Sequence, residues 1–154
     1  MKSRLSRRSF LSRSAGLAGA CISVPYFIPR SVLAAPGRPG ANDVINTGHI
    51  GVGGMGSGHL NYIKSHPQLA RCVAIADVDK NRLKKAGEVM EGKAKLFADF
   101  RELLQMSEVD AVIIATPHYL HTTLGIEALN TGLHVLVEKP ISVHKADCER
   151  LLAA

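Results

Sequence analysis

The sequence predicts an α/β fold in which a doubly wound parallel sheet, built from five βα units, carries helices on both faces. Short apolar runs alternate with helix-like segments along residues 44–154, and a glycine-rich turn follows the first run. The runs at 72–76 and 111–115 are almost continuously apolar, which is typical of strands buried on both faces of a parallel sheet. This alternating order favours parallel strands joined by crossover helices.

The individual elements follow from apolar runs bounded by turn and helix-start residues. Strands are predicted at residues 44–50, 72–76, 95–97, 111–115 and 134–137. Helices are predicted at residues 54–65, 79–91, 99–106, 121–130 and from 142 to the end of the chain. Asp79, Asp99 and Ser142 are expected to cap helices, and Gly132 is a typical residue after a helix C-terminus.

Residues 50–56 read Ile-Gly-Val-Gly-Gly-Met-Gly, the glycine spacing of a dinucleotide-binding turn. Gly51 permits the tight turn, Gly53 lets the backbone approach a pyrophosphate, and Gly56 allows close packing of helix on strand. A helix is predicted to begin near Gly54, and its first free N–H groups, at Gly54 and Met55, would point at the phosphates. An ordinary glycine-rich turn is the alternative, but the preceding strand and following helix favour a Rossmann fold that binds a nicotinamide dinucleotide.

Asp77 follows the second strand and is the predicted partner of the adenosine ribose. Its carboxylate would accept hydrogen bonds from both ribose hydroxyls and would repel a 2′-phosphate. Val78 and Asp79 come next, without an arginine to neutralise such a phosphate, so NAD is predicted in preference to NADP. Lys80 keeps NADP open as the weaker alternative.

Two further segments end predicted strands, at the edge of the sheet where the cofactor is expected. Thr116 and Pro117 end the fourth strand, and the backbone there is predicted to pass near the nicotinamide. His121 is a candidate catalytic residue, with a helix-start role as the alternative. Glu138-Lys139-Pro140 follows the fifth strand, and Lys139 is the main catalytic candidate because an ammonium group can orient a hydroxyl and stabilise negative charge on its oxygen.

The remaining histidines and cysteines point to no further chemistry. The histidines show no metal-ligand spacing, so no metal is predicted. Cys72 is interpreted as a small buried strand residue, and the cysteine spacing indicates no disulfide framework. His49 is unusual because it lies inside a strand that is expected to be buried.

The net charge of +6 comes from 19 basic and 13 acidic residues, but its excess lies in the first 35 residues. Residues 44–154 therefore carry no basic excess of the kind that nucleic-acid binding requires, and no nucleic-acid partner is predicted. The basic residues of the leader, among which no acid occurs, are Lys2, Arg4, Arg7, Arg8, Arg13 and Arg30.

Residues 1–35 have the layout of an export signal: a basic segment, a weakly apolar stretch at 15–24, and small residues at Ala34 and Ala35. Ser6-Arg7-Arg8-Ser9-Phe10-Leu11 resembles a twin-arginine signature, which predicts export to the periplasm. The alternatives are a disordered basic tail, an amphipathic surface helix, and a lipoprotein signal in which Cys21 follows Ala18-Gly19-Ala20. The apolar stretch is too short for a membrane span. Residues 36–43 are predicted to form a linker before the Rossmann domain at 44–154.

Four segments together resemble the N-terminal domain of the Gfo/Idh/MocA oxidoreductase family. They are residues 50–56, 76–77, 115–121 and 132–140. The resemblance implies an NAD(P)-dependent enzyme acting on sugars, inositols or related polyols, with Lys139 touching substrate and Glu138 near the nicotinamide ribose. Family members also carry a C-terminal substrate domain that builds the oligomer interface. We expect the present chain to lack that domain and the last sheet strand, and to be inactive by itself.

Two other functions stay open at the level of sequence. An NAD-dependent glycosidase of the same family would oxidise, eliminate and re-reduce a sugar, so that it releases reducing sugar without steady NADH formation. A non-enzymatic module would bind dinucleotide or a partner chain and show no activity toward any sugar.

Overall fold

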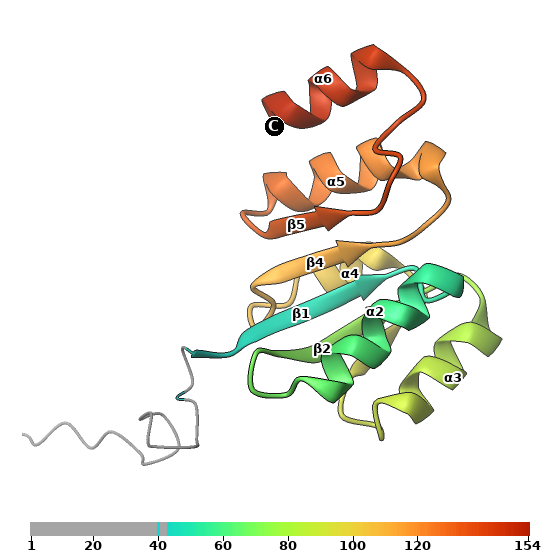
Figure 1. Ribbon diagram of the computed structural model, residues 1–154, viewed down its shortest axis with the longest axis vertical. Helices are drawn as coiled ribbons and strands as arrows, with labels where there is room; N and C mark the ends of the chain where they lie inside the picture. Colours follow the sequence, from blue (N-terminus) through green and yellow to red (C-terminus); the bar gives the residue numbers. More distant parts are fainter. Residues whose placement is uncertain (1–39, 41–42) are drawn as a thin grey trace, which may run out of the picture. The chain divides into compact units, whose positions relative to one another are not determined.

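The computed structural model describes residue 40 and residues 43–154, and these contain the predicted parallel sheet (Figure 1). Its five strands lie in the order β3-β2-β1-β4-β5, and every neighbouring pair is parallel. They are β1 (Ile45–Ile50), β2 (Ala70–Ala76), β3 (Lys95–Phe97), β4 (Ala111–Ile114) and β5 (His134–Val137). The doubly wound fold is therefore confirmed. The export signal at 1–35 and most of the linker lie outside the described residues.

The helices also follow the predicted order. They are α2 (Gly54–Ser65), α3 (Lys80–Val89), α4 (Phe100–Leu104), the short 3₁₀ helix η2 (His118–Leu120), α5 (His121–Asn130) and α6 (Lys145–Ala153). Asp79 and Asp99 are confirmed as caps, since the Asp79 carboxylate accepts the N–H groups of Asn81 and Arg82, and the Asp99 carboxylate accepts that of Arg101. The Ser142 cap was wrong: α6 begins after His144, and the Ser142 hydroxyl accepts the His144 N–H before the helix starts.

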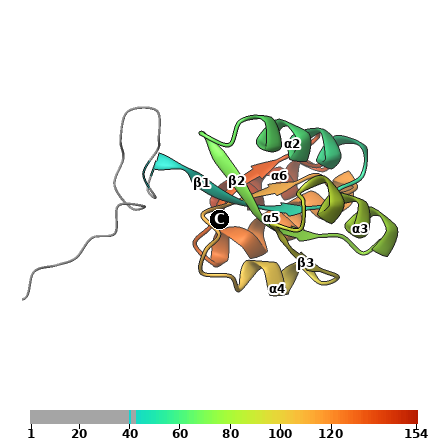
Figure 2. The ribbon, with the colours of Figure 1, turned by 90° about the horizontal axis from the view of Figure 1, so that it is seen from below.

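The sheet has a separate hydrophobic cluster on each face. Side chains of a strand alternate between the two faces, and a register shift in β2, where Val73 is skipped in the pairing with β1, puts Cys72 and Ile75 on the same face. Ile75 and Cys72 of β2 pack with Leu60 of α2 and Ala86 of α3. The neighbouring strand residues Ala74 and Ala76 join the other cluster, which contains residues of α4 and α5. In Figure 2, α2 and α4 accordingly lie on opposite sides of the sheet. Cys72 is buried in a strand, as the sequence predicts.

Strand register brings the predicted site residues to one edge of the sheet. Ile50, the last residue of β1, pairs with Ala76 of β2 and with Ile114 of β4, and Ile114 pairs with Val137 of β5. The residues that follow these four strand ends are the glycine turn, Asp77, the Thr116 segment and Glu138-Lys139-Pro140. Segments that are far apart in sequence therefore meet at the carboxyl ends of the strands.

His49 lies in the middle of β1 with its side chain fully buried. Its Nε2 is 3.2 Å from Oγ1 of Thr47, whose hydroxyl donates to the carbonyl of Arg71, so the imidazole N–H donates to Thr47. Nδ1 has no hydrogen-bond partner among the described residues. Burial, and secondarily the charge of His59, lower the pKa of His49 to about 4. The ring is therefore neutral near pH 7.

We expect His49 to make the fold sensitive to mild acid. Between pH 6.5 and about 4 the unfolded chain holds a proton on His49 that the folded chain does not, so stability is complete above pH 6.5 and falls as the pH drops. The shift corresponds to about 3 kcal/mol. Urea denaturation from pH 4 to 8 should show this slope in the parent protein and a shallower slope in His49→Leu. The exposed-histidine variant His134→Gln should keep the parent slope, and an unchanged slope in His49→Leu would contradict the assignment.

Candidate dinucleotide-binding site

A cleft of about 810 Å³ opens at the carboxyl edge of the sheet. The turn after β1, the ends of β2, β4 and β5, and the first residues of α4 and α5 line it. Except for Gly56, every predicted site residue lines this cleft: Gly51, Gly53, Gly54, Met55, Asp77, Thr116, Pro117, His121, Glu138 and Lys139. The structure thus gathers the predicted residues around one hollow.

The glycine turn owes its shape to two positions where a side chain cannot be placed. Gly51 has φ +85°, and a Cβ there would lie 2.9 Å from the carbonyl oxygen of Ala115. A Cβ on Gly56 would overlap the carbonyl oxygen of Gly51, so helix α2 packs directly against the turn. Gly56 lies under the cleft as a packing residue, which is the role the sequence predicts.

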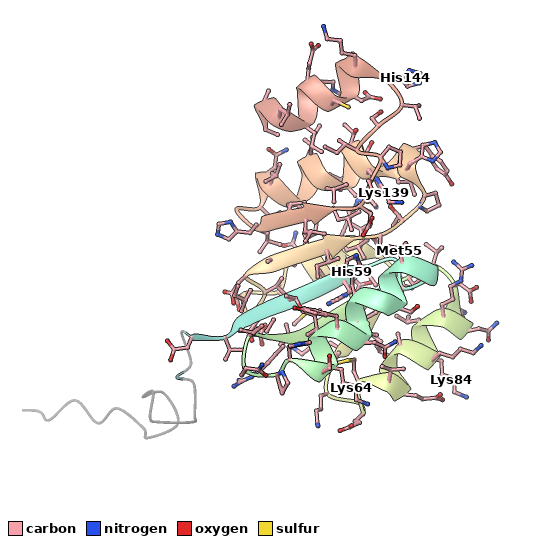
Figure 3. All side chains as sticks on the ribbon, viewed as in Figure 1. Met55, His59, Lys64, Lys84, Lys139 and His144 are labelled. Atoms are coloured by element: carbon pink, nitrogen blue, oxygen red, sulfur yellow. The ribbon has the colours of Figure 1, made fainter. Side chains whose placement is uncertain are left out.

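The N-terminus of α2 opens toward the cleft without a competing charge. Gly53 is the N-cap residue, no side chain caps the helix, and its first turn holds no acidic residue. The N–H groups of the first turn therefore remain available to an anion, and the helix dipole places partial positive charge beside them. Figure 3 shows Met55 at this end of α2. The geometry suits a pyrophosphate group.

Asp77 is 9% exposed and fixes the glycine turn to the end of β2. Its Oδ2 accepts the Val52 N–H at 2.8 Å, and its Oδ1 accepts the Asp79 N–H at 2.9 Å. Because each carboxylate oxygen can accept two hydrogen bonds, one acceptor position per oxygen is left for a hydroxyl pair. Asp77 thus shapes the site as well as facing it.

The sequence interpretation missed Arg82, which the first turns of α3 bring to the cleft. Its Nη1 would lie 3.2 Å from a Cβ on Gly53, and its Nε is 3.6 Å from Oδ2 of Asp79. The one sequence signal for this position is that Arg82 lies three residues after the Asp79 cap, a spacing that places the two side chains near each other on a helix. An arginine does reach the adenosine end of the cleft, but it is paired with an acid.

The end of β4 contributes a hydroxyl group and a bridging histidine. Oγ1 of Thr116 is buried and has no hydrogen-bond partner among the described residues, as expected for a group that a ligand would satisfy. His121 is 2% exposed, with Nδ1 2.9 Å from the carbonyl oxygen of Pro140 and Nε2 2.8 Å from that of Thr116. The ring lies between the loops after β4 and β5, and as a neutral imidazole it donates to one of these two carbonyl oxygens at a time. The catalytic role of His121 stays a prediction.

Glu138 and Lys139 follow β5 and differ in how firmly they are held. Oε1 of Glu138 is 2.6 Å from Nε2 of His59 in α2, and Oε2 accepts the Lys139 backbone N–H at 3.1 Å. The His59 hydrogen bond, followed by that of Lys139, holds the pKa of the Glu138 carboxyl below its ordinary value. The Lys139 side chain is exposed at the cleft and makes no ion pair within the described region.

Residues 43–154 contain neither a metal-ion cluster nor a membrane-spanning helix. No group of three or more histidine, cysteine or acidic side chains in this region is arranged to hold a metal ion. None of the helices in the same region has both the length and the apolar character that a membrane crossing requires.

Comparison with known proteins places residues 45–154 in an oxidoreductase family. The family model described as an oxidoreductase family with an NAD-binding Rossmann fold matches residues 45–154. The inositol 2-dehydrogenase of Salmonella typhimurium is 31% identical over 110 residues, covering 71% of this chain and 33% of that protein. The structure of myo-inositol dehydrogenase from Lactobacillus casei, in complex with NAD(H) and myo-inositol, matches with a TM-score of 0.68 and 28% identity, covering 71% of this chain and 32% of the other.

A third relative aligns along more of the chain. The glycosyl hydrolase family 109 protein of Shewanella pealeana is 29% identical over an alignment of 168 positions, gaps included, that covers 97% of this chain and 36% of that protein. The chain therefore spans about a third of the length of the relatives that it matches.

Proposed function

The chain belongs to the Gfo/Idh/MocA oxidoreductase family with an NAD-binding Rossmann fold, and on that basis we propose that it is the NAD-binding part of an enzyme that oxidises a hydroxyl group of a sugar or polyol. The observation that carries the proposal is the convergence of Asp77, the glycine turn and Lys139 on one cleft. Bound NAD would supply a hydride acceptor. The residues of this chain would bind it, orient it and act on the substrate oxygen.

Each part of the cleft fits one part of the dinucleotide. Asp77 would accept the adenosine ribose hydroxyls, and the free N–H groups of α2 would bind the pyrophosphate. The Thr116 hydroxyl, which has no hydrogen-bond partner among the described residues, would form a hydrogen bond with a polar group on the nicotinamide side. Lys139 would hold the substrate hydroxyl and stabilise negative charge on its oxygen.

NAD is proposed over NADP because of the charge around Asp77. The Asp77 carboxylate would repel a 2′-phosphate at the position where it would accept two hydroxyls. Arg82 could counter that repulsion, but it is ion-paired with Asp79. We therefore expect the adenosine end of the cleft to favour free hydroxyls.

Replacement of Asp77 tests the cofactor site. Asp77→Asn keeps the size of the side chain but replaces one carboxylate oxygen with an amide NH2. It removes the charge that would face the ribose hydroxyls and one of the two acceptors for the backbone N–H groups of Val52 and Asp79. A hydrogen bond to a charged group contributes about 1.5–3 kcal/mol. The Kd for NADH, measured by fluorescence titration, should rise about tenfold or more. The Kd for NADPH should change less. Removal of the carboxylate charge also removes its repulsion of the 2′-phosphate, which offsets part of the lost hydrogen bonding.

A control shows what the loss of a backbone-binding carboxylate does away from the cleft. Asp110 also accepts a backbone N–H, that of Asn46 at 2.8 Å, but it precedes β4, away from the carboxyl ends of the strands. Asp110→Asn should leave the Kd for NADH unchanged. An equal Kd for the parent protein and Asp77→Asn would remove Asp77 from the site.

A glycosidase is the second candidate function, favoured by the relative that aligns along 97% of the chain. Such an enzyme would use the same cleft and the same cofactor but would return the hydride to the sugar. Release of reducing sugar from a nitrophenyl glycoside without accumulation of NADH would support this candidate. Steady NADH formation from a free polyol would support the dehydrogenase.

We also propose that the protein is exported through the twin-arginine pathway. The order of basic segment, weakly apolar stretch and small residues at Ala34-Ala35 supports this proposal. Cell fractionation should place the processed protein in the periplasm, and replacement of both Arg7 and Arg8 with lysine should retain it in the cytoplasm.

A further inference from the structure

We propose that His59 is a positioning residue that holds the Glu138 carboxylate, and with it the backbone at Lys139, in the geometry that the nicotinamide half of the cleft requires. The inference rests on the proposed function, because it assigns Glu138 and Lys139 to a bound dinucleotide. Figure 3 shows His59 on α2 and Lys139 after β5. The sequence pattern alone gave His59 no role.

The contact joins two parts of the site that are 79 residues apart in sequence. His59 lies one helical turn beyond the glycine turn, and its Nε2 is 2.6 Å from Oε1 of Glu138. The second carboxylate oxygen of Glu138 accepts the backbone N–H of Lys139 at 3.1 Å. One side chain of α2 therefore fixes the orientation of Glu138, and Glu138 fixes the start of the Lys139 segment.

The far side of the same segment is held independently. The carbonyl oxygen of Pro140 is 2.9 Å from Nδ1 of His121, which belongs to α5. Lys139 thus lies between two residues that each contact a histidine of a different helix. An exposed lysine with a long flexible side chain needs such a fixed backbone if its ammonium group is to reach one position reproducibly.

The position of Glu138 assigns it to the nicotinamide half of the cleft. In the strand order β2-β1-β4-β5, Asp77 follows the first of these strands and Glu138 the last. Three strand spacings separate them, about 14 Å, and the glycine turn lies between. A dinucleotide with its adenosine at Asp77 and its pyrophosphate at the turn therefore extends toward Glu138, whereas ADP ends before it.

The charges near His59 are few. Glu138 is the acid paired with it, Lys139 adds a positive charge next to that acid, and the neutral His49 of β1 lies close enough for the charge of His59 to affect it. Side chains of His59 and Glu138 are 28% and 15% exposed, so the contact is sheltered from most of the solvent.

The test compares ligands that reach Glu138 with ligands that do not, in the 154-residue chain. His59→Leu should raise the Kd for NADH about tenfold, as expected for a lost hydrogen bond to a charged group. The Kd for ADP should stay as in the parent protein. His59→Gln, which can place an amide N–H where Nε2 lies, should restore most of the NADH affinity. His66→Leu, at the other end of α2, should change neither Kd.

Three outcomes would overturn the proposal. They are an unchanged Kd for NADH in His59→Leu, an equal loss of ADP and NADH affinity, and no rescue by His59→Gln. If the parent protein binds ADP but not NADH, the proposed function itself fails. If the parent protein binds both ligands and one of the three outcomes above is found, only the positioning role of His59 fails. A readout without ligand is the NMR shift of the Lys139 amide, which should move in His59→Leu and in Glu138→Gln and stay in His59→Gln.

Discussion

Gly56→Ala should both destabilise the fold and abolish NADH binding. The added methyl group would overlap the carbonyl oxygen of Gly51, and neither atom belongs to a flexible side chain that could move aside. Relief requires α2 to shift away from the turn, which disturbs the N–H groups proposed to bind the pyrophosphate. Forced overpacking of this kind costs on the order of 3 kcal/mol. Urea denaturation and NADH titration measure the two effects.

Gly58→Ala is the matched control for this substitution. Gly58 lies two residues further along the same helix, and a Cβ placed there meets no atom within 4 Å. The same change should therefore raise stability by about 0.5–1 kcal/mol, because alanine favours a helix over glycine. If Gly56→Ala behaved like Gly58→Ala, the close contact between α2 and the turn would not be required.

The order of elements could be predicted because local signals and the fold agree. The runs at 72–76 and 111–115 are apolar on both faces because the sheet is covered on both faces. The Asp79 and Asp99 caps mark helix starts through short-range hydrogen bonds, and the glycine spacing marks the start of α2. Helix ends were less predictable: α4 ends at Leu104, earlier than the expected residue 106.

The contacts that organise the site were less accessible to sequence reasoning. The cofactor residues follow strand ends, so a parallel sheet with its strands in register brings them together. The partners His59 and Glu138, or His121 and Pro140, depend instead on how α2 and α5 pack against the sheet. The His49–Thr47 contact also needed the structure, since the sequence only shows a histidine in an apolar strand.

Lys139→Ala should lower kcat/KM for polyol or sugar oxidation about 10²–10⁴-fold, the typical contribution of a positioned group that acts on a proton or a developing charge. The Lys139 side chain is exposed at the cleft and makes no ion pair within the described region, so its loss leaves no buried charge unpaired. The Kd for NADH should therefore change little. Steady-state kinetics with inositols and hexoses, in a form of the protein that turns over substrate, measure the effect.

The lysine variants separate charge from position. Lys139→Arg keeps the positive charge but replaces a compact ammonium with a planar group, so it should recover only part of the rate. Lys145→Ala removes an exposed lysine that pairs with Glu149 on α6 and should leave kcat/KM unchanged. Normal turnover in Lys139→Ala would show that the substrate oxygen is held elsewhere. The two histidines that fix the Lys139 segment would then serve cofactor binding alone, because only Glu138 of that segment would still face the dinucleotide.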